Sequence, residues 1–420
     1  MSMRKQSIIA FIMAGGQGSR LLPLTSQRSK PAVPFGARYR IVDFVLSNFV
    51  NSEIYTIYML VQYRSQSLIE HIRKAWRLSP LLPNQFITVV PPQMNKGDGW
   101  FQGTADAVLQ NVNLIEDHDP DLVAVFGADH IYRMDIRQMV DFHNARDADV
   151  TVSALPVPVA SAQQFGVIVA DADGRIREFQ EKPAAPVAMP GNPRYAYASM
   201  GNYIFKAEVL KSALLDARNR GGADFGHDVL PRLLRSHKLY AYNFDDNDVP
   251  GMKPYEERGY WRDVGSIDAY MEAHADVMGL KPRLDVFNTE WPILSSNYQG
   301  PVARVASGEL QNCLLGAATL IDGAKVKNTI IRREVVVEAG AELDNCIIMD
   351  YVHIGPGARL RNVIVDRHNN IEANACIGYD LEVDREFYKV TQSGIVVIPR
   401  GKADYYARDS HTDRQVRYSE

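Results

Sequence analysis

The sequence predicts an α/β protein in two parts: a mostly parallel mixed sheet with helices on both faces, followed by a parallel β-helix. Two observations carry this prediction. In the first 150 residues, short apolar runs rich in β-branched residues alternate with amphipathic helical patterns, as in parallel sheets. In the last third, two independent sets of residues recur every 16 or 17 positions, as in a coiled repeat.

The expected elements of the first part alternate along the chain. Strands are expected at Ile8–Met13, Tyr55–Val61, Phe86–Val90, Leu122–Phe126 and Val150–Leu155. Helices are expected at Gln66–Leu78, Thr104–Glu116 and Asp135–Arg146. Later elements are a strand at Ile176–Gln180 and helices at Lys206–Ala217, Asp228–Ser236 and Ser266–Met278. In such a Rossmann-like sheet, ligands bind beyond the carboxyl ends of the strands.

The repeat near the C-terminus predicts a β-helix. Its first ladder consists of Asn312, Asn328, Asn345 and Asn362, and its second consists of Ile321, Val337, Ile354 and Ile371. A period of about 17 residues is three hexapeptides, which is one coil of a triangular, left-handed parallel β-helix. We interpret each Asn as a corner residue that stacks on its equivalents and has no catalytic role. The predicted boundaries are a first domain at 1–280, a linker at 281–300 and a β-helix domain at 301–420.

The composition excludes some partners. The 420 residues include 46 Lys and Arg against 50 Asp and Glu, a net charge of −4, so there is no global case for nucleic acid or an anionic membrane. No segment approaches the ~20 apolar residues of a membrane span. The apolar run after Arg4-Lys5 stops at glycines, so it predicts a buried strand rather than a secretion signal. Three cysteines without a C-x-x-C pair indicate a reduced, cytoplasmic protein.

A glycine loop follows the first expected strand. Gly15, Gly16 and Gly18 leave backbone N–H groups open to a ligand, and Arg20 and Lys30 add positive charge close behind. The spacing matches neither the Walker P-loop nor G-x-G-x-x-G, and a glycine loop can be only a tight turn. With its two cations, this loop predicts a polyphosphate site.

Acidic residues follow two other segments. Asp129 ends the run Leu122–Phe126, where it could bind Mg²⁺ beside phosphates or cap the next helix. Asp263 is a second candidate with the same alternative, whereas His130 is interpreted as a structural neighbour. Glu181 and Lys182 could hold a sugar hydroxyl and a phosphate, or could form an exposed ion pair. Gly103 precedes a helix whose N-terminus could face a base or phosphate, or could simply be capped.

Together these segments resemble the sugar-1-phosphate nucleotidyltransferases, and within them the bacterial glucose-1-phosphate adenylyltransferases. The resemblance runs from about Ile8 to Arg400. It is carried by AGGQGSRLLPLTSQRSKPAVPFGARYRIVDFVLSN, WFQGTADAV, GADHIYRMD, FGVIVADADGRIREFQEKP, ASMGNYIF, YWRDVGSIDAY and GIVVIPR. The resemblance implies that AMP is transferred from ATP to glucose 1-phosphate, giving ADP-glucose and pyrophosphate for glycogen biosynthesis.

The resemblance also implies roles for individual residues. Gly15, Gly16 and Gly103 would bind the nucleotide, while Arg20, Lys30, Asp129 and Lys182 would be catalytic. Phe101, Gly166, Glu181, Lys182 and Ser199 would bind glucose 1-phosphate, and Asp129 and Asp263 would hold Mg²⁺. Arg28, Arg40, Arg367 and Arg400 would bind allosteric effectors such as sugar phosphates, pyruvate, AMP or phosphate. Gln62 and Trp100 would lie in loops that relay activation, and the protein would be a homotetramer.

Two alternatives remain open at this point. A sister enzyme would use another nucleotide or sugar, and a regulatory subunit on the same scaffold would be catalytically silent. Retention of Arg20, Lys30, Asp129, Lys182 and Asp263 argues against a silent site. Gln27 stands where many bacterial relatives have an activator-binding lysine, which puts fructose 1,6-bisphosphate as the activator in doubt.

Overall fold

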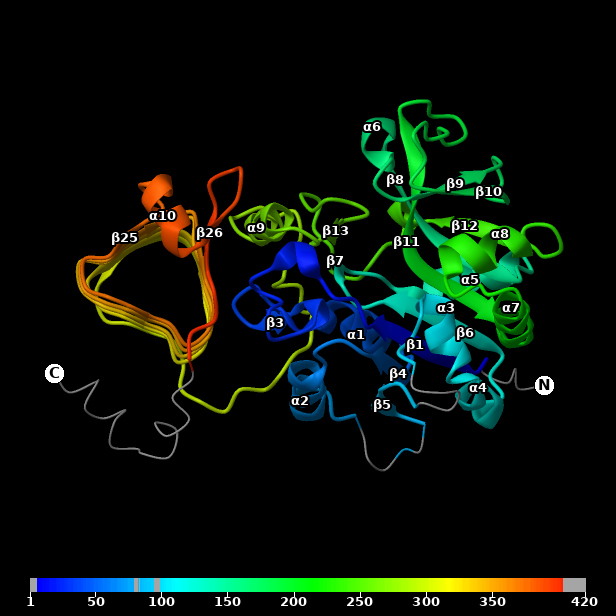
Figure 1. Ribbon diagram of the computed structural model, residues 1–420, viewed down its shortest axis with the longest axis horizontal. Helices are drawn as coiled ribbons and strands as arrows, with labels where there is room; N and C mark the ends of the chain where they lie inside the picture. The colour runs from blue at the N-terminus through cyan, green and yellow to red at the C-terminus, as the bar shows by residue number, and fades with distance from the viewer. Residues whose placement is uncertain (1–5, 79–81, 83, 94–98, 403–420) are drawn as a thin grey trace.

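A computed structural model of the chain describes residues 6–78, 82, 84–93 and 99–402. Arg4-Lys5 and both outer ends of the predicted domains, 1–5 and 403–420, lie outside the described residues. A large sheet with its helices forms one side of the molecule, and a triangular coil forms the other (Figure 1). Among the described residues, no helix is both long and apolar enough to cross a membrane.

The large sheet confirms the mixed α/β prediction. Its strands are β1 (Ile8–Ala14), β4 (Thr56–Val61), β5 (Phe86–Val90), β6 (Leu122–Gly127), β8 (Val150–Pro158), β9 (Gly166–Ala170), β10 (Ile176–Glu181), β11 (Tyr195–Lys206) and β12 (Leu239–Asn243). The main order is β10-β9-β11-β6-β1-β4-β5, and β8 pairs with both β11 and β12. The β6-β1-β4-β5 half is parallel, whereas β11 is antiparallel to β6, β8 and β9.

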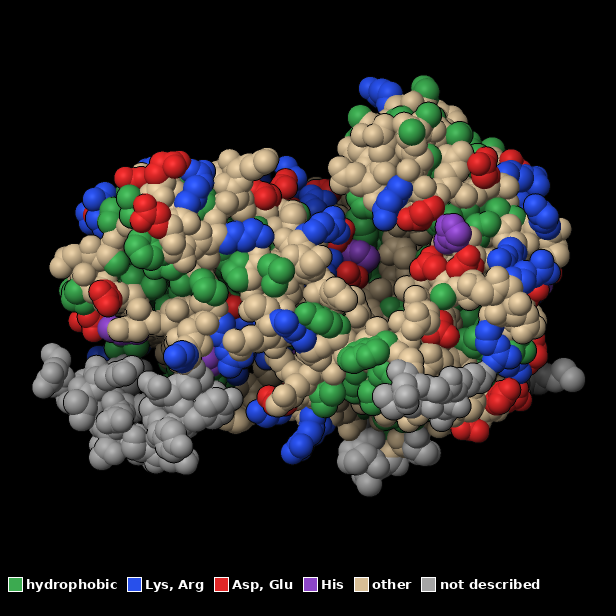
Figure 2. Space-filling view, viewed as in Figure 1, with side chains coloured by type: hydrophobic (Ala, Val, Ile, Leu, Met, Phe, Trp, Pro, Cys, Tyr) green, Lys and Arg blue, Asp and Glu red, His purple; other side chains and the backbone are tan. Residues whose placement is uncertain are grey.

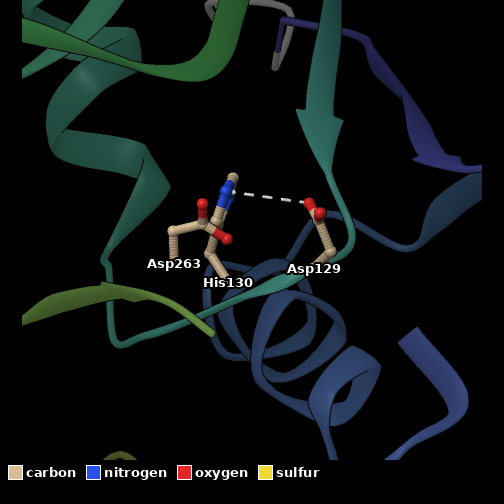
Figure 3. Close-up of side chains that lie close together, drawn as sticks. All are labelled: Asp129, His130 and Asp263. Atoms are coloured by element: carbon tan, nitrogen blue, oxygen red, sulfur yellow. Dashed lines mark ion pairs between the residues drawn. The ribbon is translucent and has the colours of Figure 1, made fainter. Parts of the chain in front are cut away.

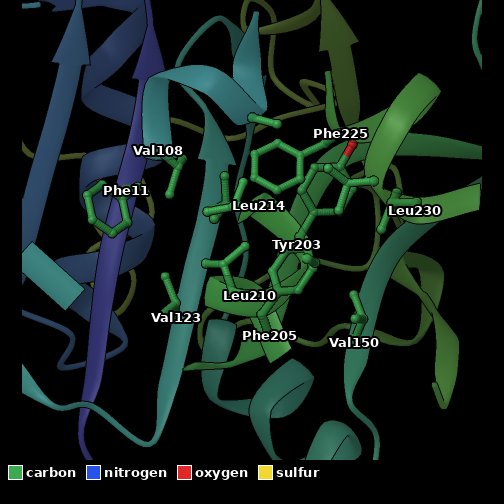
Figure 4. Close-up of a cluster of buried hydrophobic side chains, with 14 of the residues drawn as sticks. Phe11, Val108, Val123, Val150, Tyr203, Phe205, Leu210, Leu214, Phe225 and Leu230 are labelled. Atoms are coloured by element: carbon green, nitrogen blue, oxygen red, sulfur yellow. The ribbon is translucent and has the colours of Figure 1, made fainter. Parts of the chain in front are cut away.

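Helices cover both faces of this sheet. They are α1 (Ile41–Asn51), α2 (Gln66–Ala75), α3 (Thr104–Leu109), α4 (Val112–His118), α5 (Ile136–Ala145), α6 (Val159–Ala162), α7 (Ala207–Asn219) and α8 (Leu230–Leu233). Helix α9 (Ile267–Asp276) packs instead in a cluster with the β-helix. Alternate residues of central β1 point to opposite faces. Phe11 packs in one cluster with α3 and α7, as Figure 4 shows, and Ile12 packs in the other with α1, α2 and α5.

Three predicted helices differ from the structure at their bounds. The expected helix Thr104–Glu116 is two helices, because the side chain of Asn111 donates to the carbonyl of Ala107 at 2.8 Å and Asn111 itself has φ −118°. Such side-chain bonding competes with the backbone ladder. The helix from Gln66 ends at Ala75. The helix expected at Asp228–Ser236 is a π-helical turn, Phe225–Val229, followed by the short α8.

The C-terminal region is built of stacked parallel strands, consistent with the left-handed parallel β-helix that the repeat predicts. One face stacks β14 (Arg304–Val305), β16 (Leu320–Ile321), β18 (Val336–Val337), β21 (His353–Ile354) and β24 (Asn370–Ile371). The others are formed by β15 (Gly308–Leu315), β17 (Ala324–Ile331), β19 (Glu342–Asp344), β20 (Ile347–Ile348), β22 (Arg359–Arg361), β23 (Val363–Val365), β25 (Cys376–Ile377), β26 (Lys389–Val390) and β27 (Val396–Ile398). Helix α10 (Leu381–Phe387) lies outside the coil (Figure 1).

The two sequence ladders are structural ladders. The register joins Ile321, Val337, Ile354 and Ile371 from coil to coil. The four asparagines take φ values of 53°, 47°, 53° and 55°, the left-handed conformation that Asn tolerates better than most residues. Asn312 donates to Asn328 at 2.9 Å and Asn345 donates to Asn362 at 2.7 Å, whereas Asn328 reaches Asp344. The interpretation of these residues as stacked corners is confirmed.

The β-helix and the sheet region share a hydrophobic core. Leu21, Val33 and Phe35 from the N-terminal segment pack in one cluster with Ile330 and Ile364 of the coil. Above this core, buried Arg332 pairs with Asp350 at 2.9 Å and donates to backbone carbonyls of β2 (Pro34–Phe35), of Gly36 and of β3 (Tyr39–Arg40). The segment that follows the glycine loop is therefore anchored directly to the β-helix.

Acid should destabilise this junction through His274. Its Nε2 accepts a hydrogen bond from the Gly36 N–H at 3.1 Å and its Nδ1 donates to the Tyr270 carbonyl at 2.8 Å, so the ring is held neutral. Burial lowers the pKa of His274 from 6.5 to about 3. Because the unfolded chain binds this proton more readily, stability is full above pH ~6.5 and falls below it by about 1.4 kcal/mol per pH unit. Urea unfolding between pH 7 and 5 should show a steeper loss in the wild type than in His274→Gln. Equal slopes would contradict this role.

Candidate active site

The predicted site residues converge on one cavity of about 630 Å³. It opens at the carboxyl ends of β1, β4 and β6, where parallel sheets bind ligands. Figure 2 shows it as a hollow with acidic and histidine side chains at its floor. Of the predicted residues, those lining it are Gly15, Gly16, Arg20, Lys30, Gln62, Phe101, Gly103, Asp129, Gly166, Glu181, Ser199 and Asp263.

The glycine loop forms one wall. Gly18 has φ +62°, and a Cβ there would lie 3.0 Å from Cβ of Lys30. Glycine is therefore needed both for the backbone conformation and for the close approach of the lysine stem. A Cβ on Gly16 would meet nothing within 4 Å, so this part of the loop is open. The short 3-10 helix Ser19–Leu21 carries Arg20, whose side chain is 74% exposed.

Lys30 lies between the two predicted metal ligands. Its Nζ is 3.0 Å from Oδ2 of Asp129 and 2.6 Å from Oδ1 of Asp263. Burial alone would lower the pKa of Lys30, but these two carboxylates outweigh burial and raise it. Partial burial also opposes ionisation of Asp129, yet the charges of His130 and Lys30 lower the pKa of Asp129 to about 2. The carboxylate and the ammonium are therefore both charged throughout the neutral pH range.

Strand pairing brings Asp129 and Asp263 together although they are far apart in sequence. The short strand β7 (His130–Tyr132) pairs antiparallel with β13 (Trp261–Asp263), with His130 directly opposite Asp263. Ligand atoms of Asp129, His130 and Asp263 lie within 4.8 Å of one another, and Figure 3 shows the three side chains facing a common space. His130, interpreted from sequence as a neighbour, thus also borders this space.

The donor set fits a hard divalent cation. One carboxylate comes from the turn between β6 and β7 and the other from the end of β13, and Mg²⁺ prefers one or two such carboxylates together with phosphate oxygens and water. Lys30 holds one oxygen of each carboxylate, and Arg20 approaches the second oxygen of Asp263 at 3.7 Å. The arrangement can bind a cation and polyphosphate side by side.

The opposite wall comes from three neighbouring strands and is polar. Gly166 on β9, Glu181 on β10 and Ser199 on β11 face the cavity. A Cβ on Gly166 would lie 2.9 Å from the Phe179 ring and 3.1 Å from Oε2 of Glu181. Any larger residue at position 166 would displace the carboxylate, which makes this glycine part of the site's shape.

Sequence reasoning missed residues on this wall, notably Tyr203, Phe225 and Asp224. Asp224 accepts hydrogen bonds from Oγ1 of Thr104 at 2.9 Å and from the backbone N–H of Gly226 at 2.9 Å. The glycine-flanked run from Gly221 to Gly226 was the available signal. Packing explains the glycine at position 103, because a Cβ there would lie 2.4 Å from the Ala223 carbonyl oxygen.

Two predicted residues stand outside the lining. The Lys182 side chain is 66% exposed, with its Nζ 3.5 Å from Oε1 of Glu181 at the cavity edge. Trp100 is 57% exposed. Gln62 lines the cavity and holds the residue after Trp100: its Oε1 accepts from the Phe101 N–H at 2.6 Å and its amide donates to the Phe101 carbonyl at 3.3 Å. These contacts join the two predicted relay loops.

The predicted effector arginines gather at the junction instead. Arg28 is buried and donates to both oxygens of Asp366 at 2.6 Å. Burial together with the charge of Arg367 lowers the pKa of Arg40 to about 9, and burial with the charge of Arg28 lowers that of Arg367 to about 10. Arg400 contributes to the same repulsion. A separate cavity of about 320 Å³ at this junction is lined by Arg40 and other cations.

Comparison with known proteins assigns both parts of the chain. Residues 9–279 match the Nucleotidyl transferase family, and residues 302–398 match the family described as GlmU-like, C-terminal hexapeptide. The chain is 54% identical to a glucose-1-phosphate adenylyltransferase of Thermodesulfovibrio yellowstonii, over 94% of this chain and 96% of the relative. It is 51% identical to the enzyme of that name from Thermus thermophilus, over 95% and 99%.

A third relative, from Anaeromyxobacter sp., bears the same name and is 46% identical over 94% of this chain and 98% of its own length. These matches span the sheet region with its cavity and the β-helix alike. The chain therefore belongs to the glucose-1-phosphate adenylyltransferase family.

Proposed function

We propose that the protein transfers AMP from ATP to glucose 1-phosphate, giving ADP-glucose and pyrophosphate for glycogen biosynthesis. One observation carries the proposal: two cations and two carboxylates lie between a bare glycine wall and a polar wall in a single cavity. That order suits a polyphosphate on one side, a sugar on the other, and the reacting phosphorus between them. The names of the relatives support the choice of ATP and glucose 1-phosphate.

In the proposed reaction, a phosphate oxygen of glucose 1-phosphate attacks the α-phosphorus of ATP in line, and pyrophosphate leaves. Little covalent chemistry is needed from the protein, so positioning and charge stabilisation dominate. Gly15 and Gly16 would admit the nucleotide to the backbone, and Arg20 and Lys30 would neutralise the leaving pyrophosphate. Glu181, Ser199 and the newly found Asp224 would orient the sugar hydroxyls, and Gly103 would set the helix N-terminus near the nucleotide.

Nucleotidyltransferases of this kind use a divalent metal, and we propose Mg²⁺, held by Asp129 and Asp263. When bound, it would screen the phosphates from one another. Lys30 pairs with both side chains, and the pKa of Asp129 is lowered to about 2, which suits Asp129 to this ligand role at neutral pH.

We propose that Lys182 binds the phosphate of glucose 1-phosphate from the edge of the cavity. Lys182→Ala should therefore raise KM for glucose 1-phosphate by one to two orders of magnitude and change KM for ATP little, since a charge-assisted phosphate contact contributes about 1.5–3 kcal/mol. Steady-state kinetics with each substrate varied separately would measure the split. Lys211→Ala, which removes a lysine that pairs with Glu208 outside the cavity, is the matched control. Equal effects on both KM values would exclude the assignment.

We further propose that Arg28, Arg40, Arg367 and Arg400 form an anionic-effector region, with Gln62 and Trp100 relaying its state to the cavity. Burial and neighbouring cations lower the pKa of Arg40 and of Arg367, and cations crowded in this way favour an anion nearby. We also propose that the protein is a homotetramer and that it is located in the cytoplasm. The cytoplasmic location is supported by the three free cysteines, because thiols stay reduced in that compartment.

A pyrophosphate-release assay tests the proposed function. Glucose 1-phosphate is offered with each common NTP and Mg²⁺, with and without fructose 6-phosphate, fructose 1,6-bisphosphate, pyruvate and AMP. Release with ATP far above other NTPs is expected, and at least one anion should change the rate. Preference for another NTP would indicate a sister enzyme, and no release under any condition would indicate a silent subunit. Light scattering would test the tetramer.

A further inference from the structure

The contacts of Lys30 have a consequence for metal binding. Its ammonium is 3.0 Å from Oδ2 of Asp129 and 2.6 Å from Oδ1 of Asp263, so it already bridges the two carboxylates as a cation. Mg²⁺ would bind such oxygens at about 2.1 Å and would therefore stand within a few ångströms of the same point. The ammonium and the metal would therefore share the same two carboxylates.

Charge makes the two occupants incompatible. An ammonium and a divalent cation on the same pair of carboxylates would place three positive charges within about 4 Å of one another, opposed by only two negative charges. Arg20 adds further positive charge at 3.7 Å from the second oxygen of Asp263. Within the described residues, His130 is the remaining group of this cluster and supplies no compensating negative charge.

The stem of Lys30 allows its head to move without moving the loop. The lysine lies in the 3-10 turn Lys30–Ala32, directly before Pro31, and Gly18 packs closely on its Cβ. Its base is thus fixed, while the four-carbon side chain lines the open cavity beside the glycine wall. A polyphosphate on that wall offers the ammonium a new anionic partner within the same space.

We propose that Lys30 and the divalent cation exclude one another between Asp129 and Asp263, so that the metal site opens only when a polyphosphate draws Lys30 away. This rests on the proposed function for the identity of the polyphosphate. Lys30 then pairs with the two carboxylates before the polyphosphate binds, and with the phosphates afterwards. By linkage, the cation and the polyphosphate strengthen each other's binding through this one side chain.

The test is a titration with Mn²⁺ alone, followed by electron paramagnetic resonance, on the full chain without nucleotide or sugar phosphate. Lys30→Met removes the charge and keeps the length of the side chain. It should bind Mn²⁺ at least about tenfold more tightly than the wild type, although it loses turnover. Lys211→Ala removes an equal charge outside the cavity and should leave Mn²⁺ affinity unchanged. Unchanged or weaker Mn²⁺ binding by Lys30→Met would overturn the proposal.

Two further measurements keep the result decisive. The double variant Lys30→Met, Asp129→Asn should lose the gained affinity, because the gain requires both carboxylates; a gain that persists would place the Mn²⁺ elsewhere and refute the inference. If Lys30→Met is destabilised by its unpaired carboxylates, Mn²⁺ should raise its Tm more than it raises that of the wild type, and an equal rise would count against exclusion. Because no substrate is present, a failed pyrophosphate assay would refute the proposed function alone.

Discussion

Asp129→Asn should lower kcat by at least about a thousandfold, some 4 kcal/mol of transition-state stabilisation, and should leave the fold intact. The carboxylate stands at the end of β6 and contacts Lys30 at 3.0 Å. With a pKa of about 2 it is fully charged at neutral pH, and the amide removes that charge at nearly constant volume. Pyrophosphate release under saturating ATP and glucose 1-phosphate measures the loss, and thermal unfolding measures the fold.

The interpretation depends on a control for the loss of one acidic group. Asp216→Asn serves because Asp216 lies on the surface of α7, paired with Arg220, and outside the cavity. It should retain full turnover. Near-normal activity of Asp129→Asn would show that Asp129 is not needed to hold the metal. Asp263 and His130 would then be the remaining candidate ligands of the cluster.

The elements that the sequence predicted well are those with a clear period. The strands Phe86–Val90 and Leu122–Phe126 and the β-helix ladders were found because each pattern repeats the same local environment. Helix α1 was missed because nine of its residues, Ile41 to Phe49, are buried, so no polar face marks the helical period. Strand β11 escaped notice because small and polar residues interrupt its apolar positions, although it pairs antiparallel with β6, β8 and β9.

Some residues of the candidate site could also be predicted from the sequence, and others could not. Gly15 and Asp129 could be predicted because they closely follow expected strands, at the edge where ligands bind. Arg20 and Lys30 could be predicted because they add positive charge after the glycine loop. Their partner Asp263 became a neighbour only through the β7–β13 pairing, which no local pattern announces. Asp224 was missed because its partner Thr104 lies 120 residues away along the chain, and the glycine-flanked run around Asp224 does not show that contact. The sequence shows which residues follow the strands of a parallel sheet. It does not show which residues long-range strand pairing brings next to them.

Removing one partner of the buried pair between Arg28 and Asp366 should be the most destabilising single change at the junction. Both side chains are almost fully buried, and the guanidinium donates to both carboxylate oxygens. Arg28→Met or Asp366→Asn leaves a buried charge without its partner, which costs about 3–5 kcal/mol. The double variant leaves no buried charge and should recover most of this loss. Asparagine is chosen because it can still accept the hydrogen bond from the Arg367 N–H.

Urea unfolding of the four proteins would measure the coupling free energy, and additive losses would show that the pair is not an energetic unit. The same series tests what the β-helix does for the cavity. Arg28 stands two residues before Lys30, so its bond to Asp366 fixes the backbone from which the lysine reaches Asp129 and Asp263. Each single variant should therefore lower kcat/KM for ATP while the protein is still folded. If activity follows only the folded fraction, the pair stabilises the junction without positioning Lys30.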